Sequence, residues 1–296
     1  MKLYSIGELA VLSQIKAHTI RIWEQRYQLL TPERSEGNTR YYSESQLKKL
    51  LKVALLNKSG MKISHIARLS DDELLAKTAE VAVKDHSLEV AVDNLMVASM
   101  NFDQHRIIEL FDQYNEKYGI EDTFEKIIFP YLRVVGNLWV NGKITPGHEH
   151  FFTNLCKLRL FSAIDHLPLQ NQKLPHILLA QPEWDFHELG ILYYQYLFRK
   201  AGYPCTYLGQ AVPAADVIQT ASTIKAEVVI TTFIGPTTQE QIMRYLSQLL
   251  EQIPDARFYI SGPHVDFPLN DYEGRLTVFY NMQVLIDTFQ LKTLKQ

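Results

Sequence analysis

The spacing of apolar positions changes twice along this chain of 296 residues. Residues 1–70 carry short apolar stripes at helical spacing. Residues 71–167 continue as four or five helices separated by breaks near Asp85-His86, Asn101-Phe102 and Gly119-Ile120, which predicts a small helical bundle. Beyond residue 175, short apolar runs alternate with amphipathic stretches, the pattern of a doubly wound parallel sheet. The pattern therefore predicts a multidomain α and α/β protein.

The alternating C-terminal part predicts five strands and four helices. The strands are expected at 176–181, 205–208, 227–233, 257–261 and 276–280, and the helices at 187–201, 213–224, 237–252 and 282–294. The polar, proline-bracketed segment 168–175 before them is typical of a linker. We expect three domains: a winged helix-turn-helix at 1–72, a four-to-five-helix bundle at 73–167, and a flavodoxin-like sheet at 168–296.

The first two predicted helices are short and close together. Helical spacing puts Leu9 and Leu12 on the inner face of the first, and Ile20 and Trp23 on that of the second. Two such helices form a helix-turn-helix, whose second helix enters the major groove of DNA. Gly37-Asn38 then offers a tight turn between two extended arms, which predicts a β-wing.

Charge is distributed unevenly. Residues 1–70 carry 12 Lys/Arg and 5 Asp/Glu, a net charge of +7, whereas the rest carries 18 and 28, a net charge of −10. A basic N-terminal segment, residues 1–70, which we call the head, followed by an acidic remainder favours nucleic-acid binding by the head. A solvated charged surface without a partner would give the same imbalance. Cys156 and Cys205 lack the spacing of a metal cage. With no signal-peptide core and no run of 18 apolar residues, a cytoplasmic protein without a membrane partner is expected.

The block from His18 to Glu24, followed by Arg40-Tyr41-Tyr42, resembles the MerR family of transcription regulators over residues 1–70. The resemblance implies that double-stranded DNA with repeated or palindromic half-sites is the partner, and that the protein is not an enzyme. The second helix and the wing would contact the DNA through Lys16, His18, Thr19, Arg21, Arg40 and Tyr41. Guanidinium groups such as that of Arg21 suit bidentate phosphate contacts. Lys16 stands where the family usually has a Ser or Thr N-cap, whose absence costs roughly 1 kcal/mol.

Three short motifs follow predicted strands of the C-terminal part. Asp185-Phe186-His187-Glu188-Leu189-Gly190 follows the first strand, Thr232-Phe233-Ile234 comes after 41 further residues, and Gly262 after 27 more. Their order and separations resemble the cobalamin-binding domain of methionine synthase and the coenzyme-dependent mutases. The resemblance implies a cobalamin cofactor, with adenosylcobalamin as the expected form and His187 as the lower cobalt ligand.

By the same resemblance, Asp185 orients the imidazole of His187, and Thr232 supplies a hydroxyl beside the nucleotide tail. A metal-bound imidazole commonly gives its second N–H to a carboxylate. Gly190 leaves room for a bulky group against the backbone. Where the family has a second glycine after Gly262, this chain has Pro263, whose ring crowds the position and which lacks an N–H. The alternative for the hexapeptide is a surface loop in which Asp185 caps the next helix and His187 is solvated.

The polar cluster His148-Glu149-His150 begins the last helix of the predicted bundle, and nine residues separate Trp139 from Glu149. This spacing resembles the CarH/LitR group of MerR regulators, which use adenosylcobalamin as a light-sensitive ligand. It implies that Trp139 covers the upper face of the corrin, Glu149 bonds the adenosyl group, and His150 is a nearby polar or ligating group. The alternative is a core tryptophan and an ordinary helix start. Light-sensing members often carry a histidine where this chain has Val140, which leaves light sensing open.

Together these features predict a transcription repressor whose oligomeric state and DNA affinity are set by cobalamin held between bundle and sheet. No heptad-patterned dimerisation helix follows residue 70, so assembly into a dimer or tetramer is expected to come from elsewhere. One alternative is a regulator that keeps the fold without the cofactor and responds to protein–protein contacts, which Pro263 and Val140 favour. A mutase or methyltransferase fragment is a third alternative, but the chain leaves no space for the barrel domain of those enzymes.

Overall fold

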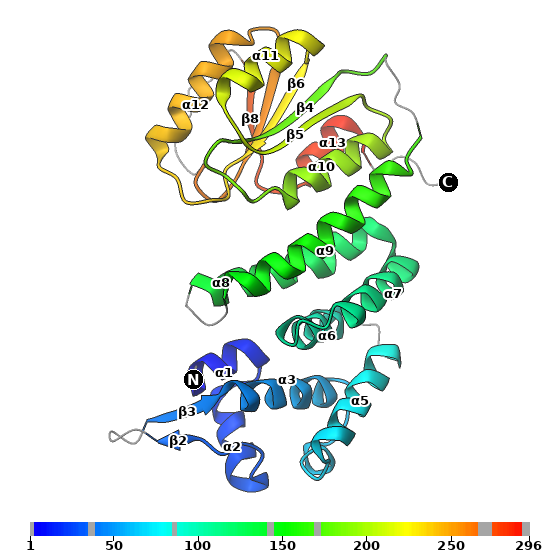
Figure 1. Cartoon of the computed structure of the whole chain (residues 1–296), viewed down its shortest axis with the longest axis vertical. Helices are drawn as coiled ribbons and strands as arrows, with labels where there is room; N and C mark the ends of the chain where they lie inside the picture. Colours follow the sequence, from blue (N-terminus) through cyan, green and yellow to red (C-terminus); the bar gives the residue numbers. More distant parts are fainter. Residues whose placement is uncertain are drawn as a thin grey trace. The chain divides into compact units, whose positions relative to one another are not determined.

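The computed structural model in Figure 1 describes residues 3–34, 39–84, 88–140, 145–168, 173–265 and 274–291. The chain forms two compact units, Met1–Thr153 and Asn154–Gln296. The boundary between them falls inside helix α9 (Pro146–Asp165). The three-domain division expected from the sequence stays a prediction.

The first unit opens with short helices around a small antiparallel sheet. Its elements are β1 (Leu3–Ser5), α1 (Ile6–Ser13), α2 (Ala17–Tyr27), β2 (Glu33–Arg34), β3 (Arg40–Ser43), α3 (Glu44–Lys58) and α4 (Ile63–Ile66). β3 lies between β1 and β2. Ser5 caps α1 in a capping box with Glu8, and Ser43 caps α3, which fixes where both helices begin. The predicted winged helix-turn-helix is confirmed, while its turn, Gly37-Asn38, lies outside the described residues.

The core of this head consists of the positions that helical spacing placed inward. Leu9, Leu12, Ile20 and Trp23 are each at most 6% exposed. Full burial of one such apolar side chain contributes about 1.5–3 kcal/mol. The inner faces of α1 and α2 therefore hold the pair together and leave their opposite faces to solvent.

The rest of the first unit is helical. It comprises α5 (Asp71–Lys84), α6 (Leu88–Met100), α7 (Gln104–Thr123), the π-helix η1 (Phe124–Ile128), α8 (Phe129–Val140) and the first part of α9. The break expected near Asn101-Phe102 ends α6, whereas the one expected near Gly119 is a kink inside α7, where Gly119 has φ 78°. The break expected at Asp85-His86 lies outside the described residues. Phe152 packs on Phe111 and Tyr131, with ring centroids 5.9 and 4.3 Å apart.

The second unit contains a five-stranded parallel sheet. Its elements are β4 (Ile177–Pro182), α10 (Leu189–Lys200), β5 (Cys205–Val212), α11 (Ala214–Ile224), β6 (Val228–Thr232), α12 (Gln239–Gln252), β7 (Arg257–Ser261), β8 (Leu276–Val278) and α13 (Gln283–Phe289). The strand order β5-β4-β6-β7-β8 is the flavodoxin-like order 2-1-3-4-5. In Figure 1, α11 and α12 cover one face of the sheet and α10 and α13 the other. The predicted doubly wound sheet is confirmed.

The strand that departs furthest from its sequence-based bounds is β5. β5 continues to Val212, four residues beyond the predicted end, because Gly209 with φ 81° absorbs a register shift against β4. A glycine inside a strand weakens the alternating pattern but permits such a bulge. The longer strand pairs as far as Pro182, and it borders the loop after β4. Among the described helices, none has the length and apolarity needed to cross a membrane.

Candidate functional site

The loops after β4 and β6 lie at the centre of the sheet's carboxyl edge. β4 pairs with β5 on one side and β6 on the other, so the chain changes direction across the sheet at β4. Open α/β sheets bind ligands at such a switch point, outside the carboxyl ends of the strands. The motifs that begin at Asp185 and Thr232 both lie there.

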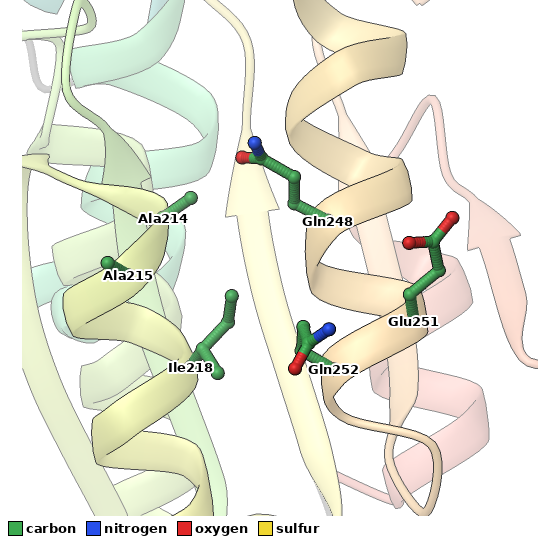
Figure 2. Close-up of a pocket in the computed structure, with 6 residues that line it drawn as sticks. All are labelled: Ala214, Ala215, Ile218, Gln248, Glu251 and Gln252. Atoms are coloured by element: carbon green, nitrogen blue, oxygen red, sulfur yellow. The ribbon is translucent and has the colours of Figure 1, made fainter.

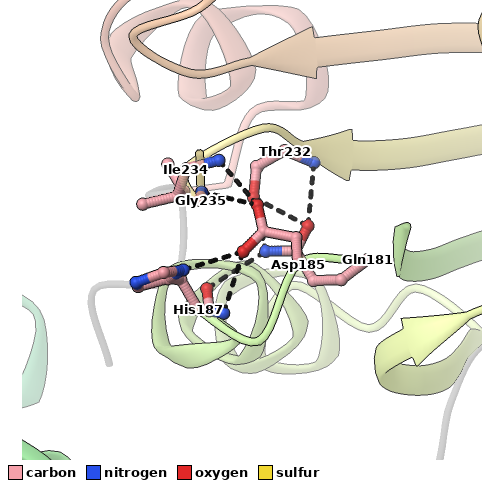
Figure 3. A network of polar contacts seen from close by, with 6 residues as sticks. All are labelled: Gln181, Asp185, His187, Thr232, Ile234 and Gly235. Carbon is pink, nitrogen blue, oxygen red and sulfur yellow. Dashed lines mark hydrogen bonds and ion pairs between the residues drawn. The ribbon is translucent and has the colours of Figure 1, made fainter. Parts of the chain in front are cut away.

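The carboxylate of Asp185 joins the two loops. It is fully buried, and its Oδ1 accepts hydrogen bonds from the backbone N–H of His187 at 3.0 Å and from His187 Nδ1 at 2.9 Å. Its Oδ2 accepts from the backbone N–H groups of Ile234 at 2.7 Å and Gly235 at 3.0 Å, as Figure 3 shows. Burial alone would raise the pKa of Asp185, but these hydrogen bonds outweigh it and hold the pKa below its ordinary value. Asp185 is therefore an ionised, purely accepting group.

This geometry fixes the tautomer of His187. Because an ionised carboxylate can only accept, Nδ1 is protonated, and in the neutral ring Nε2 then carries the lone pair that a metal ion can take. The His187 side chain is 44% exposed. An imidazole oriented in this way by a carboxylate is the usual arrangement of a metal-binding histidine. The capping alternative is wrong, since Glu188 is the N-cap of α10 and no side chain caps that helix.

Gly235 is a site residue that the sequence patterns did not single out. A Cβ added there would lie 3.2 Å from Asp185 Oδ1 and 3.3 Å from His187 Nδ1, tighter than most contacts of a real Cβ. Gly235 therefore leaves room for the carboxylate–imidazole pair, and its N–H donates a hydrogen bond that holds Asp185 in place. Its position directly after the Thr232-Phe233-Ile234 motif is the signal that could have found it.

The hydroxyl of Thr232 is engaged by a second missed residue, Gln181. Thr232 is 2% exposed, and its Oγ1 lies 2.8 Å from Nε2 and 3.0 Å from Oε1 of Gln181. Gln181 is fully buried at the end of β4 and also donates to the backbone oxygen of His187 at 3.0 Å. A buried amide at the end of an apolar strand could have been noticed, since such groups need specific partners.

The two glycines predicted at the site have different surroundings. An added Cβ at Gly190 meets nothing within 4 Å, so open space borders the first turn of α10. At Gly262, with φ 143°, an added Cβ would lie 2.1 Å from the backbone oxygen of Phe233. Gly262 therefore lets the loop after β7 pack on the loop after β6. Pro263 follows it and is exposed.

Three large apolar side chains are exposed at the carboxyl ends of the strands. Phe186 follows β4, Ile234 follows β6 and Tyr280 follows β8, and they are 64%, 41% and 74% exposed. Because the strands are parallel, these ends share one edge of the sheet. We call this set the apolar rim. Exposed apolar side chains at the ligand-binding edge of an open α/β sheet suit contact with an apolar ligand.

The predicted polar cluster of the first unit does begin a helix. Glu149 and His150 lie in the first turns of α9, with His150 Nδ1 3.0 Å from Glu149 Oε2 and the His150 side chain 71% exposed. His148 packs against Phe102, with ring centroids 4.4 Å apart and the rings tilted by 33°. Trp139 belongs to α8, but its side chain lies outside what the structure describes. Its predicted role stays a prediction, as do those of Glu149 and His150.

The second helix of the head presents a polar, basic surface. Lys16 is its N-cap residue and makes no side-chain capping bond, as the sequence predicted. Lys16, His18 and Arg21 are exposed, and Thr19 Oγ1 lies 3.4 Å from His18 Nε2. Uncapped N–H groups at a helix start favour an anion such as phosphate.

Glu24 joins this helix to the wing, a link that the sequence did not reveal. Its carboxylate accepts from Arg40 Nε at 3.1 Å and from the Tyr42 hydroxyl at 2.7 Å. Tyr42 is fully buried, and burial, with the adjoining Glu24 carboxylate, raises the pKa of its hydroxyl. Tyr41 stays partly exposed. The ion pair thus fixes Arg40 relative to α2 before any phosphate is bound.

A groove of about 310 Å³ lies elsewhere, between α11 and α12 (Figure 2). It is lined by Ala214, Ala215, Ile218, Gln248, Glu251 and Gln252. It contains none of the residues at the carboxyl edge of the sheet. Its lining is small apolar and amide side chains with one carboxylate, Glu251, and no second titratable group to pair with it, and we assign it no function.

Comparison with protein families divides the chain into three matched segments. Residues 4–73 match the MerR HTH family regulatory protein model. Residues 71–161 and 175–276 match two different B12 binding domain models. The DNA-binding head, the helical segment and the sheet therefore each have a family assignment.

Two relatives match most of the chain. The HTH-type transcriptional repressor CarH of Myxococcus xanthus is 28% identical over 85% of this chain and 85% of its own length. The repressor CarA of the same organism is 25% identical over 87% and 85%. Among solved structures, the monomethylamine corrinoid protein of Methanosarcina barkeri is 14% identical, covers 70% of this chain and 96% of its own, and has a TM-score of 0.49. The chain is a transcriptional regulator that joins a MerR-type DNA-binding domain to B12-binding domains and resembles CarH.

Proposed function

We propose that this protein is a transcription repressor that binds cobalamin, expected as adenosylcobalamin, and that the bound cofactor sets its oligomeric state and its affinity for DNA. The single observation that carries the proposal is the Asp185–His187 pair. Its hydrogen bond puts the lone pair on Nε2 of a half-exposed imidazole at the switch point of the sheet. The relatives CarH and CarA, both named as repressors, support the regulatory part.

The residues at the carboxyl edge fit such a cofactor. A neutral imidazole nitrogen is a suitable ligand for first-row transition metals. Open space beside Gly190 and the apolar rim of Phe186, Ile234 and Tyr280 suit a broad, largely apolar ring system. When bound, cobalamin supplies a cobalt ion that takes the imidazole as a ligand and, in its adenosyl form, a cobalt–carbon bond.

The chain's own residues have separate tasks in this proposal. Asp185 holds the His187 ring in one tautomer and one orientation, and Gly235 leaves room for the pair. Gly262 keeps the loop after β7 close to the loop after β6. We further propose that Trp139, Glu149 and His150 contact the upper part of the same cofactor, as the resemblance to the CarH/LitR group implies.

In the head, α2 would enter the major groove, with Lys16, His18, Thr19 and Arg21 facing bases and phosphates. Arg40 and Tyr41 of the wing would hold the flanking backbone. Ligand-dependent assembly would bring several heads onto neighbouring half-sites, and the effective concentration of the second head would raise affinity without new contacts. Light would act only if it changed the bound cofactor, and Val140 stands where light-sensing members often have histidine.

A second candidate is a regulator that keeps this fold without cobalamin. The observation that favours it is the engagement of the Thr232 hydroxyl by Gln181, together with Pro263 after Gly262. In that case the motif residues serve packing alone. Catalysis is not part of either proposal.

Loading with adenosylcobalamin separates the two candidates. The full chain is incubated with excess cofactor, desalted, and its visible spectrum recorded in the dark and after green light. We expect retained corrin absorbance for the wild type and for the control His166→Ala, which is exposed directly after the end of α9. His187→Ala should lose most of it. A folded wild type without corrin absorbance would support the second candidate and exclude the first.

A further inference from the structure

The buried amide of Gln181 links the two motifs of the proposed site. It lies at the end of β4, four residues before Asp185, and no part of its side chain is exposed. Figure 3 shows it between the His187 loop and the end of β6. Its Nε2 donates to the backbone oxygen of His187 and to Thr232 Oγ1, at 3.0 and 2.8 Å. Its Oε1 accepts from the backbone N–H of Thr232 at 3.2 Å.

These partners fix which end of the amide is which. Only the NH₂ group can donate to the carbonyl of His187, and only the oxygen can accept from the N–H of Thr232. A flipped amide would set donor against donor and acceptor against acceptor. The orientation of Gln181 is thus determined by the backbone of the two loops, in contrast to an amide on the surface, whose two ends are hard to tell apart.

The arrangement also sets the polarity of the Thr232 hydroxyl. When Nε2 of Gln181 donates to Oγ1, one lone pair of the hydroxyl is used, and its hydrogen is left to donate. Oε1 of Gln181, 3.0 Å away, accepts that hydrogen, so both hydrogen bonds of the buried hydroxyl are made with the same amide. Asp185 and Gln181 hold the same loop at different points, Asp185 through the ring and N–H of His187, and Gln181 through its carbonyl.

From this network we infer that Gln181 is a positioning residue of the cobalamin site. It holds the main chain of His187 so that the imidazole keeps its place as a cobalt ligand, and through Thr232 it ties that loop to the end of β6. The inference rests on the proposed function. Groups that orient a metal ligand typically account for about 10-fold to 100-fold in metal affinity.

The test uses the full chain loaded with cobalamin and reduced to the Co(II) form. Electron paramagnetic resonance then reports whether the axial nitrogen comes from histidine, because labelling histidine with ¹⁵N changes the splitting from that nitrogen. For the wild type we expect a splitting that responds to the label. Gln181→Met is similar in shape but has no amide. For this variant we expect a spectrum that does not respond to the histidine label, and an affinity for cobalamin that is about 10-fold or more lower.

Two further variants make the outcome decisive. Gln181→Glu keeps an acceptor for Thr232 but sets a carboxylate against the His187 carbonyl. It should therefore also lose the histidine signal. If Gln181→Met does not fold, Gln181→Glu replaces it in the test. Leu179→Met is the matched control on the same strand and should behave as the wild type. If both Gln181 variants kept the histidine signal and the cobalamin affinity of the wild type, this inference would be overturned while the proposed function would stand. The same would follow if Leu179→Met lost as much histidine signal and cobalamin affinity as the Gln181 variants. A folded wild type that retains no corrin would overturn the proposed function and this inference with it.

Discussion

Oδ2 of Asp185 lies 2.7 Å from the backbone nitrogen of Ile234, although the two residues are far apart in the sequence. This bond ties the loop after β4 to the loop after β6. The other oxygen of the same carboxylate takes the Nδ1–H of His187. One buried side chain thus decides both the distance between the two motifs and the tautomer of the proposed ligand.

Asp185→Asn is expected to lower stability at neutral pH and to weaken cobalamin binding. The amide cannot accept at all four positions, and each buried N–H left without a partner costs about 1–3 kcal/mol. The folded-state pKa of Asp185 lies below its ordinary value of 3.8, so its contribution is present above that pH and is lost as the pH falls through the folded-state pKa. Urea unfolding of wild type and variant from pH 7 to pH 2.5 measures this. If the difference in free energy of unfolding between wild type and variant did not become smaller at low pH, Asp185 would not be the stabilising carboxylate described here.

Gly235→Ala is expected to displace the Asp185–His187 pair, since the new methyl group would press on both side chains. Overpacking of this kind costs typically about 1–3 kcal/mol. Gly190→Ala is the matched control for stability, because nothing lies near its added Cβ and alanine suits a helix better by roughly 0.5–1 kcal/mol. Thermal melting of the proteins without cobalamin measures the stability of both variants. A Gly235→Ala variant with the melting temperature of the wild type would show that the close contact relaxes without cost.

Arg21→Ala is expected to weaken DNA binding by similar factors on different sequences. If Arg21 contacts a phosphate, its loss also reduces the slope of log affinity against log salt concentration by about 1. Fluorescence anisotropy with labelled duplexes at several salt concentrations measures the slope. Arg244→Ala removes an exposed arginine from α12 and controls for net charge. Equal slopes for the two variants would remove Arg21 from the DNA interface.

Cobalamin is expected to change the oligomeric state of the full chain. The ligand can shift assembly only as far as it binds one state more tightly than the other. Sedimentation velocity of apo, loaded, and loaded and illuminated protein tests this. A single species in all three samples would rule out control of DNA binding through assembly. Cobalamin would then have to change the DNA affinity of a protein with a constant oligomeric state.

The sequence predicted the alternating elements well because their apolar periods are local. The switch-point placement of Asp185 and His187 followed from the position of the motif after a strand. Gln181, Gly235 and Glu24 were missed because their roles arise from contacts between segments that only the fold brings together. A single sequence contains no periodic signal for such pairs.

The end of β5 was missed for a different reason. Gly209 takes a positive φ, and the strand continues past it to Val212. A pattern that treats glycine as a strand end stops too early at such a bulge. The kink at Gly119 is the helical counterpart, since the helix continues beyond a residue expected to end it.

The most direct test of cobalt ligation is a crystal structure of the cobalamin-loaded chain with an anomalous difference map recorded at the cobalt edge. We predict one strong peak about 2 Å from Nε2 of His187, the usual length of a bond between imidazole and a first-row metal ion. A peak elsewhere in the molecule, or a loaded crystal whose cobalt has no histidine neighbour at the carboxyl edge of the sheet, would contradict it.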